Sequence, residues 1–264
     1  MPDAPPIKRK KRYGRTLLES LAAPSLSLLI LVVWQVAVPA AGLSSFVLPT
    51  PWEIVGRIGG DYRLLLANAA VTVSEMLAGF AIAAVAGIVT GLGIFYSRLF
   101  ERAFYPLLVA LNTIPKVVLA PLLVLYLGYG FAPKCFLAFV LAYFPIVIAT
   151  VVGLQSLDKG MVSLVRSMGA SETQVFFKVR LPAALPNLFG GFKVGISLSI
   201  IGAVIGEYVA AEHGLGYVQL QASSQFDTTL SFAAVVVIGV IGVVLFLALD
   251  MLERRAVFQR DAAK

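Results

Sequence analysis

Residues 156–186 read SLDKGMVSLVRSMGASETQVFFKVRLPAALP, the longest charged segment between apolar runs of the chain. Asp158 is suited to begin a short helix, because an aspartate side chain can accept a hydrogen bond from a free N–H of the first turn. Four apolar residues then recur at the spacing of one helical face, namely Met161, Leu164, Val165 and Met168. We therefore expect an ordered amphipathic helix here, held between two apolar runs.

The next residues predict the end of this helix and the start of a second one. Gly169 stands where helices commonly end in a left-handed residue, because glycine has no Cβ to clash in that conformation. Ser171 is followed three residues later by Gln174, which is the pattern of a capping box. Pro182 cannot continue a helix internally but suits the first turn of a following one. The loop 155–186 is thus predicted to be two short helices joined by a bend.

The composition is that of an integral membrane protein. Of the 264 residues, 59% are hydrophobic and only 13% are charged, and the mean hydropathy is +0.91. A soluble domain carries about a quarter charged residues. Cys135 is the single cysteine, so an internal disulfide is excluded.

Six apolar runs are long enough to be spanning helices, which predicts an all-α, polytopic fold. The first run exceeds the ~7–15 apolar residues of a signal peptide, so we interpret it as a span. We predict two parts in the chain: a basic tail, residues 1–20, and a transmembrane domain, residues 21–264. The predicted spans cover residues 21–41, 67–96, 103–127, 134–153, 188–210 and 230–249.

Two of these spans have compositions with structural consequences. The third contains Pro106, Pro115 and Pro121, so it cannot be a straight helix. The second is rich in glycine, and small residues let membrane helices approach closely. Its glycines are Gly79, Gly87, Gly91 and Gly93.

The basic residues predict the orientation in the membrane. Six spans place both termini on one side, and 17 of the 21 lysines and arginines lie on that side, against three on the other. Basic residues accumulate on the cytoplasmic side of membrane proteins. We therefore predict cytoplasmic termini, a cytoplasmic loop 155–186 and a cytoplasmic basic tail. The net charge of +7 is then a topology signal and not the mark of a nucleic-acid partner.

Gly169, nine intervening residues and then Val179-Arg180-Leu181-Pro182 resemble the cytoplasmic EAA loop of ABC importer permeases, EAA-x3-G-x9-I-x-LP. Ser163-Leu164-Val165 stand in place of Glu-Ala-Ala. Further stretches are similar to permeases of the nitrate/taurine/sulfonate branch, so that the similarity extends from Leu48 onward. They are LPTPWEI at 48–54, IPK at 114–116, APL at 120–122, GYG at 128–130, GE at 206–207 and GLG at 214–216.

The resemblance implies a type I ABC importer permease in a bacterial inner membrane. It further implies a homodimer, two ATP-binding subunits and a periplasmic solute-binding protein. The cargo would be a nitrate-, sulfonate- or taurine-like anion, or a pyrimidine- or vitamin-like compound. The loop would couple to the ATPase through Met161, Ser163, Leu164, Val165, Arg166, Met168, Gly169, Ala170, Leu181 and Pro182.

The sequence lacks the motifs that would bind ATP or a zinc ion in this chain. It contains no Gly-Lys dipeptide and therefore no phosphate-binding G-x4-G-K-[ST] loop. ATP and Mg²⁺ would be bound by a partner, and we expect neither a cofactor nor enzymatic activity in this chain. His213 is the single histidine, which together with one cysteine leaves no paired zinc-ligand motif; we interpret it as an outer-loop residue.

Charged residues within spans are costly and usually paired or functional. At about 1.5 Å per residue, Glu75 lies ~12 Å below the outer edge and Lys116 ~20 Å above the inner edge of a ~30 Å core. We predict that these two form an ion pair, the alternative being that Lys116 faces an anionic substrate.

The proline-broken third span is the other candidate for the pathway. Non-helical backbone at membrane depth is tolerated where it lines a cavity, although neighbouring helices can also satisfy a kink. Glu207 belongs either to a gate or to the solvated interface. The candidate pathway residues are Glu75, Asn112, Thr113, Pro115, Lys116 and Glu207.

Two classes of transporter remain after these observations. A self-sufficient secondary transporter or channel predicts inverted repeats and coupling-ion carboxylates near the midplane. No convincing repeat relates residues 21–130 to 134–249, and Glu75 is the only acid placed so deeply. A membrane-bound enzyme is a third and more distant reading. The sequence favours the permease subunit of an ATP-driven importer.

Overall fold

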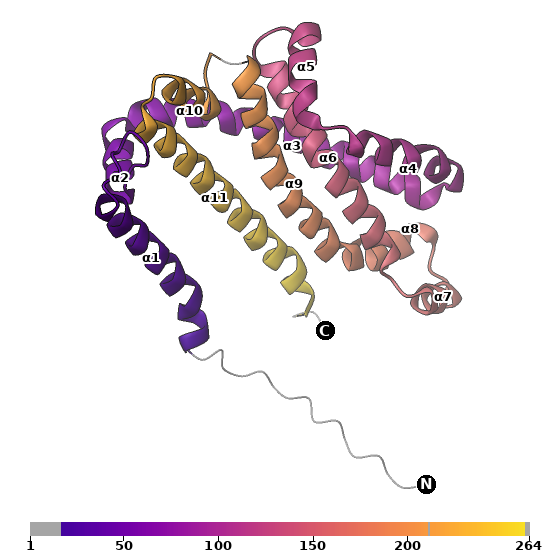
Figure 1. Ribbon diagram of the computed structural model, residues 1–264. Coiled ribbons are helices and arrows are strands. Elements are labelled where there is room, and N and C mark those ends of the chain that lie inside the picture. The colour runs from indigo at the N-terminus through magenta and orange to yellow at the C-terminus, as the bar shows by residue number, and fades with distance from the viewer. Residues whose placement is uncertain (1–16, 211, 262–264) are drawn as a thin grey trace.

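The computed structural model describes residues 17–210 and 212–261, and the regular elements within these ranges are all helical (Figure 1). The predicted tail, residues 1–20, falls outside the described residues except for its last four. The α-helices are α1 Leu17–Ala40, α2 Pro51–Gly60, α3 Tyr62–Tyr96, α4 Arg98–Thr113, α5 Leu119–Leu127, α6 Phe131–Gln155, α7 Lys159–Ser167, α8 Glu172–Val175, α9 Leu181–Ala210, α10 Leu215–Ser224 and α11 Thr228–Asp261. Two short turns complete the list, the 3₁₀ turn η1 Lys116–Val118 and the π turn η2 Phe176–Arg180.

Four helical runs within the described ranges are long and apolar enough to cross a membrane, which makes this a multi-pass membrane protein. They are Tyr62–Tyr96, Phe131–Gln155, Glu172–Val209 and Thr228–Val257. A fifth run consists of α4 and the η1–α5 segment, which are bent by 79° at a short break, as the prolines predicted. The first predicted span falls on α1, in which the fully described apolar stretch is Pro24–Ala40. Six spans therefore stay a prediction.

Helix α6 is the centre of the bundle, and it packs between α3 and α9. Gly79 of α3 lies so close to α6 that a Cβ there would be 2.6 Å from the Ala138 Cβ and from the Cys135 carbonyl oxygen. On the other side, a Cβ at Gly202 of α9 would be 2.6 Å from the Ala138 Cα. In lipid, such close backbone approach supplies the packing that holds helices together.

The close-approach role predicted for the glycines of the second span is confirmed for Gly79, Gly87 and Gly91, which all meet α6. Gly93 differs, because it faces the Phe100 ring of α4, with a Cβ-to-Cε1 distance of 2.9 Å. The glycines therefore serve two packing contacts of α3 and not one.

The remaining helices surround this centre unevenly. Helix α11 packs against α9 and α10, and α2 lies across its beginning. Helix α1 stands apart and contacts the chain mainly at α2 (Figure 1). Figure 1 places α7, the start of α1 and the end of α11 toward one end of the molecule, with α2 and α10 at the other.

We predict that Gly79→Ala lowers thermal stability. The added methyl would overlap the α6 backbone, and overpacking of this kind costs about 1–3 kcal/mol. Gly190→Ala on α9 is the matched control, because a Cβ there meets nothing within 4 Å. Thermal unfolding of the detergent-solubilised protein measures both variants. Equal melting temperatures for the two would contradict the packing described above.

Candidate functional site

Helix α7 projects from one end of the bundle and presents apolar side chains to its surroundings. Met161, Leu164 and Met168 are 48%, 58% and 79% exposed, whereas Val162 is buried. Asp158 stands at the predicted N-cap position, but its side chain makes no capping hydrogen bond. The amphipathic helix is therefore present, and most of its predicted stripe faces outward.

The bend after α7 has the geometry that the sequence predicted. Gly169 has φ +86°, a left-handed conformation that favours glycine. Its N–H donates to the Arg166 carbonyl at 2.9 Å, and the Ala170 N–H donates to the Val165 carbonyl at 3.3 Å. These two hydrogen bonds form a Schellman motif. The bend thus directs α7 away from the span that follows it.

The second helix begins at the predicted capping box, in which Ser171 and Gln174 each bond the other's backbone N–H. The helix does not stop at Pro182. Residues Glu172–Val209 form one continuous run, with the π turn η2 immediately before Leu181. The Leu181 N–H donates to the Phe176 carbonyl, five residues back. Pro182 lies in the first turn of α9, as predicted, but the wider π turn accommodates it without a break.

The broken third span carries the predicted pathway residues. Ile114 and Pro115 adopt extended conformations between α4 and η1. The Lys116 Nζ donates to the Asn112 carbonyl at 2.8 Å and to its side-chain Oδ1 at 2.7 Å. The ammonium thus lies at the C-terminal, partially negative end of α4, where a positive charge is favourable. The predicted Glu75–Lys116 ion pair is wrong, because Lys116 bonds within its own broken helix.

A cavity of about 380 Å³ lies beside this break. Asn112 and Lys116 supply polar groups to its wall, whereas Thr113 and Pro115 form the break without lining it. Its lining residues are Leu108, Leu111, Asn112, Ile114, Lys116, Leu119, Phe136, Phe139, Val140, Tyr143 and Phe144. Size and lining both fit a small-molecule site, which is mostly apolar with a few polar groups.

Glu75 belongs to a different, fully buried cluster, where it forms an ion pair with Lys134 of α6. The two side chains are only 1% and 5% exposed. The sequence analysis counts Lys134 among the three basic residues of the outer side, because it stands at the start of a predicted span, and so it misses this pairing. The sequence did contain a signal for the pairing. Lys134 lies in the first turn of a predicted span, and a charged side chain within a span needs a partner.

Glu207 is buried beside this pair, so the solvated-interface reading is wrong. Its Oε1 accepts a hydrogen bond from the Thr72 hydroxyl at 2.6 Å, and its Oε2 accepts one from the Gly216 N–H at 2.5 Å. The Leu215 N–H donates to Thr72 at 2.9 Å. Together these bonds fix the start of α10 onto α3 and α9. His213, in the same connection, is exposed, in agreement with its prediction as a loop residue.

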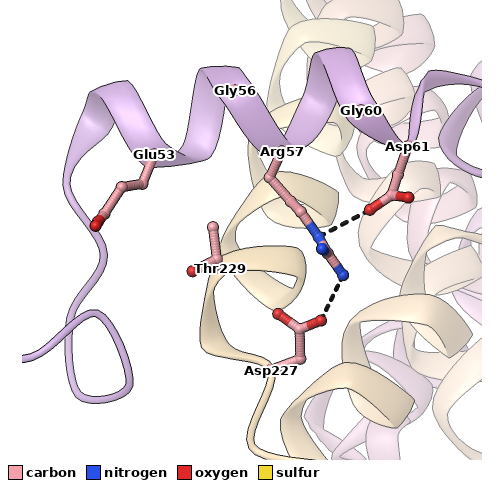
Figure 2. A pocket seen from close by; sticks show the side chains of 7 residues that line it. All are labelled: Glu53, Gly56, Arg57, Gly60, Asp61, Asp227 and Thr229. Carbon is pink, nitrogen blue, oxygen red and sulfur yellow. Dashed lines mark hydrogen bonds and ion pairs between the residues drawn. The ribbon is translucent and has the colours of Figure 1, made fainter.

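Arg57 clamps α2 across the beginning of α11, as Figure 2 shows. Its Nε lies 2.8 Å from Asp61 Oδ2 and its Nη2 2.6 Å from Asp227 Oδ2. These groups line an open pocket of about 480 Å³ together with Glu53 and Thr229. A hydrogen bond from the Ser45 hydroxyl lowers the pKa of Glu53. The clamp fixes the amphipathic α2 at the end of the bundle opposite α7.

Comparisons with known proteins agree with this architecture. Residues 79–257 match the family described as binding-protein-dependent transport system inner membrane component. The formylaminopyrimidine transport permease protein of Halalkalibacterium halodurans is 35% identical over 227 residues, which cover 86% of this chain and 90% of that protein. The riboflavin transport system permease protein of Chloroflexus aurantiacus is 35% identical over 237 residues, or 89% and 88% of the two chains.

A third relative is the putative aliphatic sulfonates transport permease protein of Bacillus subtilis. It is 29% identical over 262 residues, which cover 96% of this chain and 91% of that protein. Among solved structures, an inward facing conformation of the MetNI methionine ABC transporter has a similar fold. Its TM-score is 0.66 at 21% identity, over 75% of this chain and 98% of that one.

We predict that Lys134→Met strongly destabilises the protein, because it leaves the Glu75 carboxylate buried without its partner. Breaking a buried pair on one side costs about 3–5 kcal/mol, whereas replacing both partners by apolar residues is often neutral. The double variant Glu75→Leu, Lys134→Met should therefore recover part of the lost melting temperature, the rest being lost because Glu207 stays buried beside the replaced pair.

Lys116→Met serves as the control for this experiment, since Lys116 only caps α4, an interaction that contributes roughly 0.3–1 kcal/mol. Thermal unfolding of all four proteins gives the comparison. A loss from Lys116→Met as large as that from Lys134→Met would show that the pairing described here is incorrect.

Proposed function

The chain belongs to the family of inner membrane components of binding-protein-dependent transport systems, and from that premise we propose that it is the membrane-spanning permease subunit of an ATP-driven importer. The observation that carries the proposal is the exposed apolar face of α7. Met161, Leu164 and Met168 are all about half exposed or more, on a short helix held in a fixed orientation by the Gly169 bend.

An exposed apolar face on an ordered helix is typical of a contact surface for another protein. Short amphipathic helices commonly bind by laying such a face into an apolar groove. We infer that the groove belongs to a separate ATP-binding subunit, since this chain has no phosphate-binding loop. ATP and Mg²⁺ would then be bound by two copies of that subunit, and α7 would transmit its closure to the spans.

The positions of α7 and of the ends of α1 and α11 support the orientation inferred for the chain in the membrane. The start of α1, the end of α11 and α7 lie toward the same end of the molecule (Figure 1). With α1 as a sixth span, both termini and the loop 155–186 would face the cytoplasm of a bacterium, in agreement with the distribution of basic residues. A periplasmic solute-binding protein would then meet the opposite end, where α2 and α10 lie.

The permease would act as a homodimer, with the pathway formed between two copies. Helix α1 is the element most open to such a partner. Its apolar side chains are exposed, with values such as 63% for Leu28 and 60% for Val36, and it contacts its own chain mainly at α2. The relatives named above carry formylaminopyrimidine, riboflavin or aliphatic sulfonates, so we infer a small organic solute or anion as cargo.

We predict that Leu164→Asp abolishes most of the association with the ATP-binding subunit. An apolar contact at the centre of an interface contributes about 2 kcal/mol, which corresponds to roughly 30-fold weaker binding. Co-purification of the ATPase and ATP hydrolysis by the reconstituted complex measure the loss.

The matched control for this variant is Leu99→Asp, which changes another exposed leucine, 81% accessible, outside α7. The melting temperature should stay unchanged in both variants, because neither side chain is buried. The proposal fails if the wild-type chain transports its solute when purified without an ATPase, as a secondary transporter or channel would.

A further inference from the structure

Two glutamates from different spans lie side by side in the buried cluster around Lys134. Glu75 of α3 and Glu207 of α9 are each only 1% exposed, and their side chains lie within hydrogen-bonding reach of each other. The backbone around them packs closely. A Cβ at Gly206 would be 2.8 Å from the Lys134 Cα, and one at Gly216 would be 2.7 Å from Glu207 Oε2. The two carboxyl groups therefore share one enclosed site between α3, α6 and α9.

The charges of this site do not balance. Lys134 brings one positive charge through its ion pair within the site, whereas two ionised glutamates bring two negative charges. Cys135 of α6 and Tyr208 of α9 also face the site, but a thiol and a phenol are neutral. Glu212 and His213, which precede α10, are exposed to water. Because an uncompensated buried charge is costly, the site requires one more positive charge.

The hydrogen bonds of the site leave one oxygen without a partner. Glu207 Oε1 accepts from the Thr72 hydroxyl and Glu207 Oε2 from the Gly216 N–H. Glu75 Oε1 contacts Lys134, but Glu75 Oε2 is buried and has no hydrogen-bond partner. A buried polar atom without a partner is unfavourable. Since a carboxylate oxygen has two lone pairs, Glu207 can still accept a hydrogen bond from a proton carried by Glu75 Oε2.

We propose that this site binds one proton, shared between Glu75 Oε2 and the carboxylate of Glu207. The proton neutralises the second negative charge and also gives the unpaired oxygen a partner. A metal cation would find too few ligands, because the described residues contain no group of three His, Cys, Asp or Glu side chains that could hold one. The shared proton joins α3 to α9, and its release to water leaves two facing carboxylates in place of that bond.

Infrared spectroscopy of the full-length chain tests directly for the proton. A protonated carboxyl group has a C=O stretching band that a carboxylate lacks, and glutamates in water are ionised above about pH 5. The folded protein, in a maltoside detergent that contains no carbonyl group, should therefore show this band at about pH 7.

Three variants assign the band to the shared proton. Glu75→Gln and Glu207→Gln should each lose it, because the single remaining carboxylate is then balanced by Lys134. Glu101→Gln is the matched control and should keep the band, since Glu101 is an exposed glutamate outside the site.

The pH dependence of stability gives a second measurement. Glutamates of the unfolded chain are ionised above about pH 5, so the folded protein binds one proton more than the unfolded chain while the site keeps its proton. Raising the pH through this range favours the unfolded chain, by up to about tenfold in the unfolding equilibrium constant per pH unit. The melting temperature of the wild-type protein should therefore fall relative to that of Glu75→Gln, whose amide can donate to Glu207 and accept from Lys134 without a titrating proton.

Absence of the carboxyl band from the folded wild-type protein would overturn the proposal. A band that both Glu75→Gln and Glu207→Gln leave intact would do the same, as would melting temperatures of wild type and Glu75→Gln that change in parallel with pH. The first result needs no variant to fold. Because the assays contain neither an ATPase nor a solute, their outcome is independent of the importer proposal.

Discussion

The structure depends on the close approach of three helix backbones, with α6 held between α3 and α9. Lipid offers no hydrophobic drive for helices to associate, so their attraction comes from direct packing and from polar bonds between them. Glycines supply the packing, since positions such as Gly79 and Gly202 leave no room for a methyl group. Once the backbones are this close, the side chains of Glu75 and Lys134 can reach each other without water. The ion pair is therefore a consequence of the glycine contacts as well as a support for them.

The buried polar groups extend this centre toward the end where α2 and α10 lie. Glu207 bonds Thr72 of α3 and the backbone of Gly216, so a connecting segment is fixed by the same helices that form the core. At the opposite end, Lys193 of α9 holds α11 through Asp250 and Glu253, with Nζ-to-oxygen distances of 2.5 Å. Helix α11 is thereby attached at both of its ends, whereas α1 is attached mainly at one. This difference leaves α1 freer than α11 to contact lipid or another chain.

Local sequence signals predicted the local structure well. The Gly169 bend, the Ser171 capping box, the bent third span and the glycine contacts of α3 all follow from interactions within a few residues or from a requirement for small side chains. The errors concern which face of a helix a residue occupies. Glu75 and Lys116 were paired because their depths agreed, but depth along a span says nothing about rotation around its axis. The sequence leaves Glu207 between a gate and the solvated interface, because its burial depends on contacts with another part of the chain. The aromatic residues of α6 that line the cavity drew no prediction, because aromatic residues are common throughout apolar spans.

The π turn at η2 has a mechanical consequence. Because the helix does not break at Pro182, residues Glu172–Val209 form a single rod of 38 residues, which at about 1.5 Å per residue is ~57 Å long. A rod of this length converts a tilt of ~5° at one end into a displacement of ~5 Å at the other. The rod begins directly after the Gly169 bend, and its far end carries Glu207. Under the proposed coupling, a tilt of this rod that starts beside α7 would therefore displace the residues at the opposite end of the bundle.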